Sequence, residues 1–197
     1  MHDWKAIARK TGPLRYQMSE SDCVPTTVIN GMIFLLQRRI HPRLLNMIWH
    51  ISVESKGGSG WVTSQLLSDL LNTWFKLAVY DRNESDVMPF ESRIIEGDAA
   101  HLDRNNTIVR ALNAGGVCCL TVRDGRHYIL LLSTDGQQFL AFDPYWKRDM
   151  ASADHQTRFS EYHGLVNTVI SRAELMSLLK ISSNKWVQII SPISAVE

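Results

Sequence analysis

Two Asp-Gly pairs in the second half of the chain constrain its fold more than any other feature. They stand at 124–125 and 135–136 and separate three short apolar runs. Asp-Gly between apolar runs is the strongest short-range signal of a β-hairpin. We therefore expect the runs to pair as an antiparallel meander. The three runs are Val117 to Val122, His127 to Leu132 and Gln138 to Phe142.

The first half of the chain shows instead the apolar spacing of three to four residues that is typical of helices. Helices are predicted at Val24 to Arg38, from Pro42 through Trp49, from Thr63 or Ser64 through Trp74, at Thr107 to Asn113 and at Ser171 to Lys180. Further strands are predicted at Lys76 to Tyr80 and Trp186 to Ile190, and no firm structure is assigned to Asp81 to Asn106. Helices followed by antiparallel strands predict an α+β fold and not a parallel doubly wound sheet.

The composition is that of an ordinary globular protein. A length of 197 residues with 45% hydrophobic content fits one domain over 1–197. A net charge of +1 gives no general attraction to nucleic acid or anionic lipid, so neither is expected as a partner. Three cysteines are few and odd in number, which fits a reducing compartment. The sequence shows no signal-peptide profile and no apolar run of about 18 residues. We therefore expect a soluble, cytoplasmic protein without a membrane span.

Cys23 stands where the first predicted helix begins. Pro25 is accepted only in the first turn of a helix, so it fixes that start close to Cys23. The positive end of the helix dipole favours thiolate over thiol and makes a better nucleophile. The alternative is that Cys23 is a small buried hydrophobic residue, as most free cysteines are.

A thiol nucleophile needs a base and a group that orients the base. His127 begins a strand directly after a tight turn, and Asp143 ends the next strand within the same hairpin. Antiparallel pairing would bring them together, so that the carboxylate holds the imidazole in one tautomer. The alternative is that Asp143 with Pro144 only starts a turn and that His127 is a half-buried strand residue.

Gln17 six positions before Cys23, His127 in His-Tyr-Ile-Leu-Leu, and Asp143 before Pro144 together resemble the papain-like cysteine peptidases. The chain is most similar to their C39-like group, which is related to bacteriocin-leader-processing peptidases. The resemblance spans 14–145 and implies an N-terminal helical half bearing the cysteine and a C-terminal half of antiparallel strands. It implies Cys23 as nucleophile, His127 as general base and then acid, Asp143 as its orienting group, and Gln17 as an oxyanion donor beside the Cys23 backbone N–H.

Two residues depart from the pattern of that family. Val24 stands where many relatives have glycine, which would narrow the cleft beside the nucleophile. Asp22 places a negative charge next to Cys23 and would oppose thiolate formation unless it caps the helix or pairs with a cation. No ATP-binding cassette accompanies the domain, so export-coupled leader cleavage is not supported.

The expected function is therefore a thiol-dependent hydrolase that acts on a peptide or small amide through an acyl-enzyme on Cys23. Acyl transfer with the same residues, or a binding module that retains the fold without catalysis, remain alternatives.

No cofactor is expected, and no metal, since the histidines and cysteines lack zinc-ligand spacing. Cys118 and Cys119 stand in an apolar run and are predicted to be core residues. The oligomeric state stays open. Lesser candidates for a cleft are Trp61, Tyr145, Trp146, His155 and His163.

Overall fold

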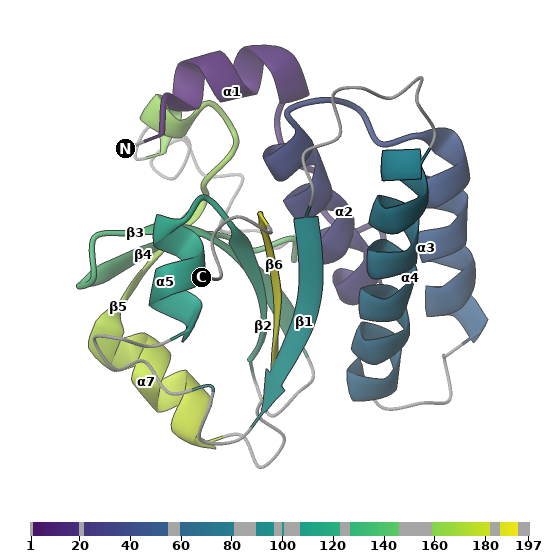
Figure 1. The fold of residues 1–197 in the computed structure, drawn as a ribbon. Helices are drawn as coiled ribbons and strands as arrows, with labels where there is room; N and C mark the ends of the chain where they lie inside the picture. Colours follow the sequence, from purple (N-terminus) through teal and green to yellow (C-terminus); the bar gives the residue numbers. More distant parts are fainter. Residues whose placement is uncertain are drawn as a thin grey trace.

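The fold is α+β and is built on one six-stranded sheet (Figure 1). The structure is a computed structural model. It describes residues 2–19, 22–54, 60–80, 90–96, 100, 107–122, 127–145, 159–181 and 186–192.

Helices come first in the chain. The first four are α1 (Trp4–Thr11), α2 (Cys23–Leu36), α3 (Pro42–Glu54) and α4 (Gly60–Tyr80). Two more, α5 (Thr107–Asn113) and α7 (Arg172–Ile181), and a 3-10 turn, η4 (Ser160–Tyr162), lie among the strands. The Ser171 hydroxyl accepts the N–H of Glu174 at 3.2 Å and so caps the start of α7.

The six strands pair antiparallel throughout, in the order β1-β6-β2-β3-β4-β5. They are β1 (Phe90–Glu96), β2 (Val117–Val122), β3 (His127–Thr134), β4 (Gln138–Phe142), β5 (Thr168–Ser171) and β6 (Trp186–Pro192). The predicted meander is present as β2-β3-β4, with Val122 paired to His127 and Leu130 paired to Phe142. A register shift between Leu131 and Ser133 adds a residue to β3.

The sheet separates two hydrophobic cores. In Figure 1 the helices α2, α3 and α4 lie on one side of it, and α5 and α7 lie on the other. Side chains of a strand alternate between its two faces. In β2, Cys119 therefore belongs to the core beneath α2 and Cys118 to the core beneath α5 and α7, as their neighbouring positions predict.

Three sequence predictions are corrected by the structure. The run from Lys76 to Tyr80 is the end of α4 and not a strand, since short apolar runs fit either structure. That helix also begins at Gly60, before Thr63. A strand, β1, lies within the stretch from Asp81 to Asn106, to which no structure was assigned.

In the N-terminal half, α2 packs on β3 and β2, and α4 packs on β1. The helix next to β3 is therefore α2. Its Thr27 hydroxyl donates to the Tyr128 carbonyl at 3.4 Å, one residue beyond His127 on β3. Asn30 of the same helix exchanges two hydrogen bonds, of 2.8 and 2.9 Å, with the backbone of Arg15. These contacts hold the start of α2, the start of β3 and the segment before Gln17 together.

None of the helices in the described residues is both long enough and apolar enough to span a membrane.

Candidate active site

Cys23 is the first residue of α2, and its side chain is buried, with 7% of its surface exposed. The first backbone N–H groups of a helix have no acceptor within it, so they carry a partial positive charge toward the start of α2. Pro25 stands in this first turn, as the sequence predicts. The thiol therefore lies where an anion is electrostatically favoured.

His127 and Asp143 meet although sixteen residues separate them. The His127 Nε2 and the Asp143 Oδ1 lie 2.7 Å apart, the short distance of a charge-assisted hydrogen bond. His127 begins β3 and Asp143 follows β4, so the hairpin between these strands produces the approach. An Nε2–H that donates to the carboxylate fixes the ring orientation.

Cys23 lies close enough to the same imidazole ring to be one of the two side chains that raise its pKa. Because Nε2 faces Asp143, Nδ1 is the ring nitrogen left for the sulfur. Burial of the ring lowers the pKa of His127, but the hydrogen bond that it donates to Asp143, the interaction with Cys23 and the charge of the Asp143 carboxylate outweigh burial and raise it to about 9. A protonated imidazole beside the Asp143 carboxylate is the charge state that this environment favours.

Asp143 is held by residues on both sides of it. Its Oδ1 also accepts the Tyr145 backbone N–H at 2.8 Å. Asn167, a buried residue before β5, pairs with the Asp143 backbone: its Oδ1 accepts the N–H at 2.7 Å and its Nδ2 donates to the carbonyl at 2.8 Å. Sequence reasoning missed Asn167, because a lone asparagine far from Asp143 in the chain carries no signal of this pairing.

Gln17 is buried beside the segment that follows Asp143. Its backbone N–H donates to the Pro144 carbonyl at 2.8 Å. One hydrogen of the side-chain Nε2 is used by the Ser19 carbonyl at 2.8 Å. A carboxamide nitrogen carries two hydrogens, so the second can be offered to a substrate oxygen. The side-chain Oε1 is buried without a hydrogen-bond partner in the described residues.

The carboxylate of Asp22 neither caps α2 nor pairs with a cation in the described residues. Asp22 is the N-cap residue by position but makes no side-chain cap hydrogen bond. Instead its two oxygens accept the backbone N–H groups of Met18 and Ser19, each at 3.0 Å. The charge next to Cys23 thus fixes the loop that follows Gln17. Val24 is buried in the core beneath α2.

Of the lesser candidates, Tyr145 lies at the site. Its ring meets the His127 ring edge to face, with centroids 5.5 Å apart. His163 is exposed next to η4. Trp146, His155 and the side chain of Trp61 lie outside the described residues. Within the residues described, no three histidine, cysteine, aspartate or glutamate side chains are grouped as metal ligands would be.

No family model, no curated protein and no solved structure matches the chain.

Proposed function

We propose that this protein is a thiol-dependent hydrolase of papain-like type, similar to the C39-like peptidases, that cleaves a peptide or amide bond through an acyl-enzyme on Cys23. One observation carries the proposal. The His127 Nε2 lies 2.7 Å from the Asp143 Oδ1, and Cys23 lies near enough to the same ring to raise its pKa, which is the arrangement that a nucleophile, its base and an orienting carboxylate require.

In the first step the Cys23 sulfur attacks the carbonyl carbon, and the carbonyl oxygen becomes an oxyanion. The Cys23 backbone N–H and the second Gln17 Nε2 hydrogen are the donors assigned to that oxygen. As the tetrahedral intermediate collapses, His127 gives its proton to the leaving amine and the C–N bond breaks. A thioester remains on Cys23.

In the second step His127, now neutral, removes a proton from water, which attacks the thioester carbonyl. The carboxylic acid leaves, and the ion pair between Cys23 and His127 is restored. If an amine attacks in place of water, the same residues perform acyl transfer. Product analysis with and without an added amine separates the two reactions, because only transfer yields the new amide.

The direct test uses an electrophilic peptide probe that forms a thioether with an activated cysteine. Cys23→Ala is expected to abolish probe labelling and turnover, because it removes the only atom that forms the covalent bond. Cys119→Ala is the matched control, since it also removes a buried thiol but in β2, and labelling should persist. Unchanged labelling of a folded Cys23→Ala variant would show that the assignment is wrong.

The burial of Cys23 favours one second candidate, a binding module that has kept the fold. With 7% of its surface exposed, Cys23 offers little access to a substrate carbonyl. In that case its thiol should react no faster than free cysteine near pH 6.

A further inference from the structure

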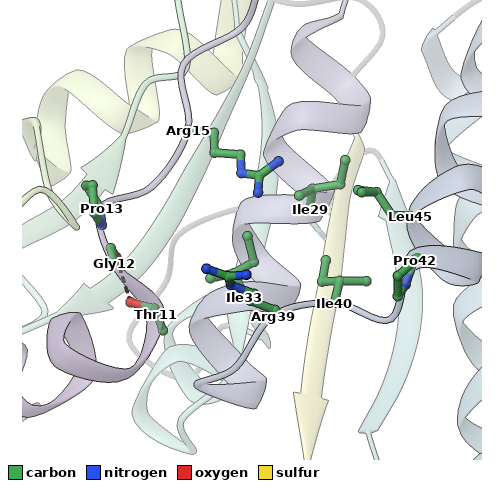
Figure 2. A pocket seen from close by; sticks show the side chains of 10 residues that line it. All are labelled: Thr11, Gly12, Pro13, Arg15, Ile29, Ile33, Arg39, Ile40, Pro42 and Leu45. Atoms are coloured by element: carbon green, nitrogen blue, oxygen red, sulfur yellow. Dashed lines mark hydrogen bonds between the residues drawn. The ribbon is translucent and has the colours of Figure 1, made fainter.

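A cavity of about 460 Å³ lies along α2, away from the residues of the candidate site (Figure 2). Its wall is formed by the turn after α1, by the middle of α2, and by the segment that leads into α3. Gln17, Cys23, His127 and Asp143 are absent from that wall. The volume falls within the range of about 300–1,000 Å³ that is usual for small-molecule sites. The cavity therefore has the dimensions of an independent ligand site.

One part of the wall is apolar. Ile29 and Ile33 stand one turn apart on α2, and Ile40 and Leu45 face them from the neighbouring segment and α3 (Figure 2). The three isoleucines are fixed in the core beneath α2, where each has less than 9% of its surface exposed, so they line the cavity with their outer edges, and the partly buried Leu45 adds apolar surface. A hydrocarbon chain that lies in the cavity is removed from water on the side that faces these residues.

Two arginines complete the wall. Figure 2 shows the guanidinium groups of Arg15 and Arg39 directed toward the same stretch of α2. In the described part of the chain neither guanidinium has a hydrogen-bond or ion-pair partner, and no lining residue is acidic. Two cations that face one cavity without an anion between them are electrostatically unfavourable, so a bound anion would stabilise them.

Local structure explains one of these arginines but not the other. Arg39 follows the carboxyl end of α2, where a helix dipole favours a cation. Arg15 lies on the extended segment that leads to Gln17. Asn30 holds its backbone N–H and carbonyl at 2.9 and 2.8 Å, so the point from which its side chain reaches the cavity is fixed. The fixed backbone removes part of the conformational cost of holding this side chain on an anion.

We propose that this cavity binds a small carboxylate that carries an apolar chain, such as a medium-chain fatty acid. The guanidinium groups of Arg15 and Arg39 pair with the carboxylate, because their planar donor forks match its two oxygens. The chain lies against Ile29, Ile33, Ile40 and Leu45. This inference does not depend on the proposed hydrolase activity, since no residue is shared between the two sites.

The test is isothermal titration calorimetry of the full-length chain with octanoate, acetate and octanamide as probes. Octanoate should bind, whereas acetate, which lacks the apolar chain, and octanamide, which lacks the charge, should each bind at least about tenfold more weakly. Absence of heat with millimolar octanoate, or equal affinity for octanamide, would overturn the proposal.

Variants then locate the site. Arg15→Gln and Arg39→Gln should each weaken octanoate binding about tenfold or more. Arg43→Gln is the matched control, because it removes one exposed arginine from the nearby start of α3 without touching the cavity wall, and octanoate affinity should stay the same. All three positions are exposed, so circular dichroism should show folded variants. An equal loss in Arg43→Gln would mean that octanoate responds to overall charge and not to this cavity.

Discussion

Cys23 and the pair Cys118 and Cys119 are all buried free thiols, yet their surroundings differ in every other respect. Cys118 and Cys119 lie in the middle of β2, inside the two cores. Burial raises the pKa of the Cys118 thiol well above its usual range, with a further increase from Cys119, and burial raises the pKa of Cys119 to about 12. Cys23 lies at a helix start and near the His127 ring, whose pKa it helps to raise. The comparison teaches that burial alone makes a thiol unreactive, and that a helix start and a nearby imidazole are what distinguish Cys23 from the other two.

The most direct test of the difference between Cys23 and the other two thiols is to alkylate all three cysteines in one sample near pH 6. A free thiol with a pKa of about 8.5 is only about 0.3% thiolate at that pH. If His127 holds Cys23 as thiolate, Cys23 should react roughly 100-fold faster than free cysteine. Cys118 and Cys119 should stay unmodified while the protein is folded. Mass spectrometry of peptides containing each cysteine gives the three rates from one sample.

His127→Gln supplies the control for that experiment. It removes the cation beside Cys23 and leaves β2 unchanged, so the rate at Cys23 should fall to that of free cysteine. If the rate in the unmodified chain is already that low, the binding module is favoured over the hydrolase.

A second, smaller effect concerns pH. His127 has a folded pKa of about 9, above the 6.5 of an unfolded histidine. Because protonated His127 donates the proton to the leaving amine, turnover should fall on the alkaline side near pH 9. Asp143→Asn removes the carboxylate charge, so the alkaline fall in turnover should occur at a lower pH. Turnover should also fall about tenfold. If turnover falls at the same alkaline pH in this variant, Asp143 does not set the charge of His127.

The same difference in pKa makes stability depend on pH. Protons bind the folded state more tightly, so the stabilisation by protonated His127 is fully present below pH 6.5 and is lost as the pH rises through 9. Urea unfolding at pH 6 and above pH 9 should show a larger loss in the unmodified chain than in His127→Gln.

The residues of the candidate site could be found from the sequence where local chemistry dictates geometry. Pro25 fixes the start of α2 at Cys23, and the Asp135-Gly136 turn determines that His127 and Asp143 approach each other. Both signals act through local chain geometry, the first within one helical turn and the second within one hairpin. The helix α5 and the strands β2 and β4 were also correctly bounded, because glycines or Asp-Gly turns delimit them.

What the sequence did not predict depends on contacts between distant segments. β5 has only four residues, and β1 carries Glu91, Arg93 and Glu96, so neither shows a clear apolar alternation. Asn167 acts on Asp143 only because β5 pairs with β4. The role of Asp22 was likewise open, since the fold of the preceding loop brings to its carboxylate the donors that it accepts from, the backbone N–H groups of Met18 and Ser19.

Two asparagines use the same pairing at different places, which gives the finest test of the comparison. Asn167 binds the backbone N–H and carbonyl of Asp143 at 2.7 and 2.8 Å, and Asn72 binds those of Ser92 at the same two distances. Asp143 contacts the His127 ring, whereas Ser92 lies on β1 and bonds through its hydroxyl to Ser68. The pairings are equal in form and differ in what they position.

Asn167→Ala and Asn72→Ala should each lower the free energy of unfolding by about 1–3 kcal/mol, because each leaves backbone groups without partners. Only Asn167→Ala should also slow Cys23 alkylation, by a few-fold, and shift the alkaline limb of turnover below pH 9, since a displaced Asp143 stabilises protonated His127 less well. Urea unfolding and the pH profile of each variant measure the two effects separately. Equal changes in the pH profile of both variants would mean that Asn167 acts through general stability, and that the surroundings of Cys23 are set by His127 and Asp143 without it.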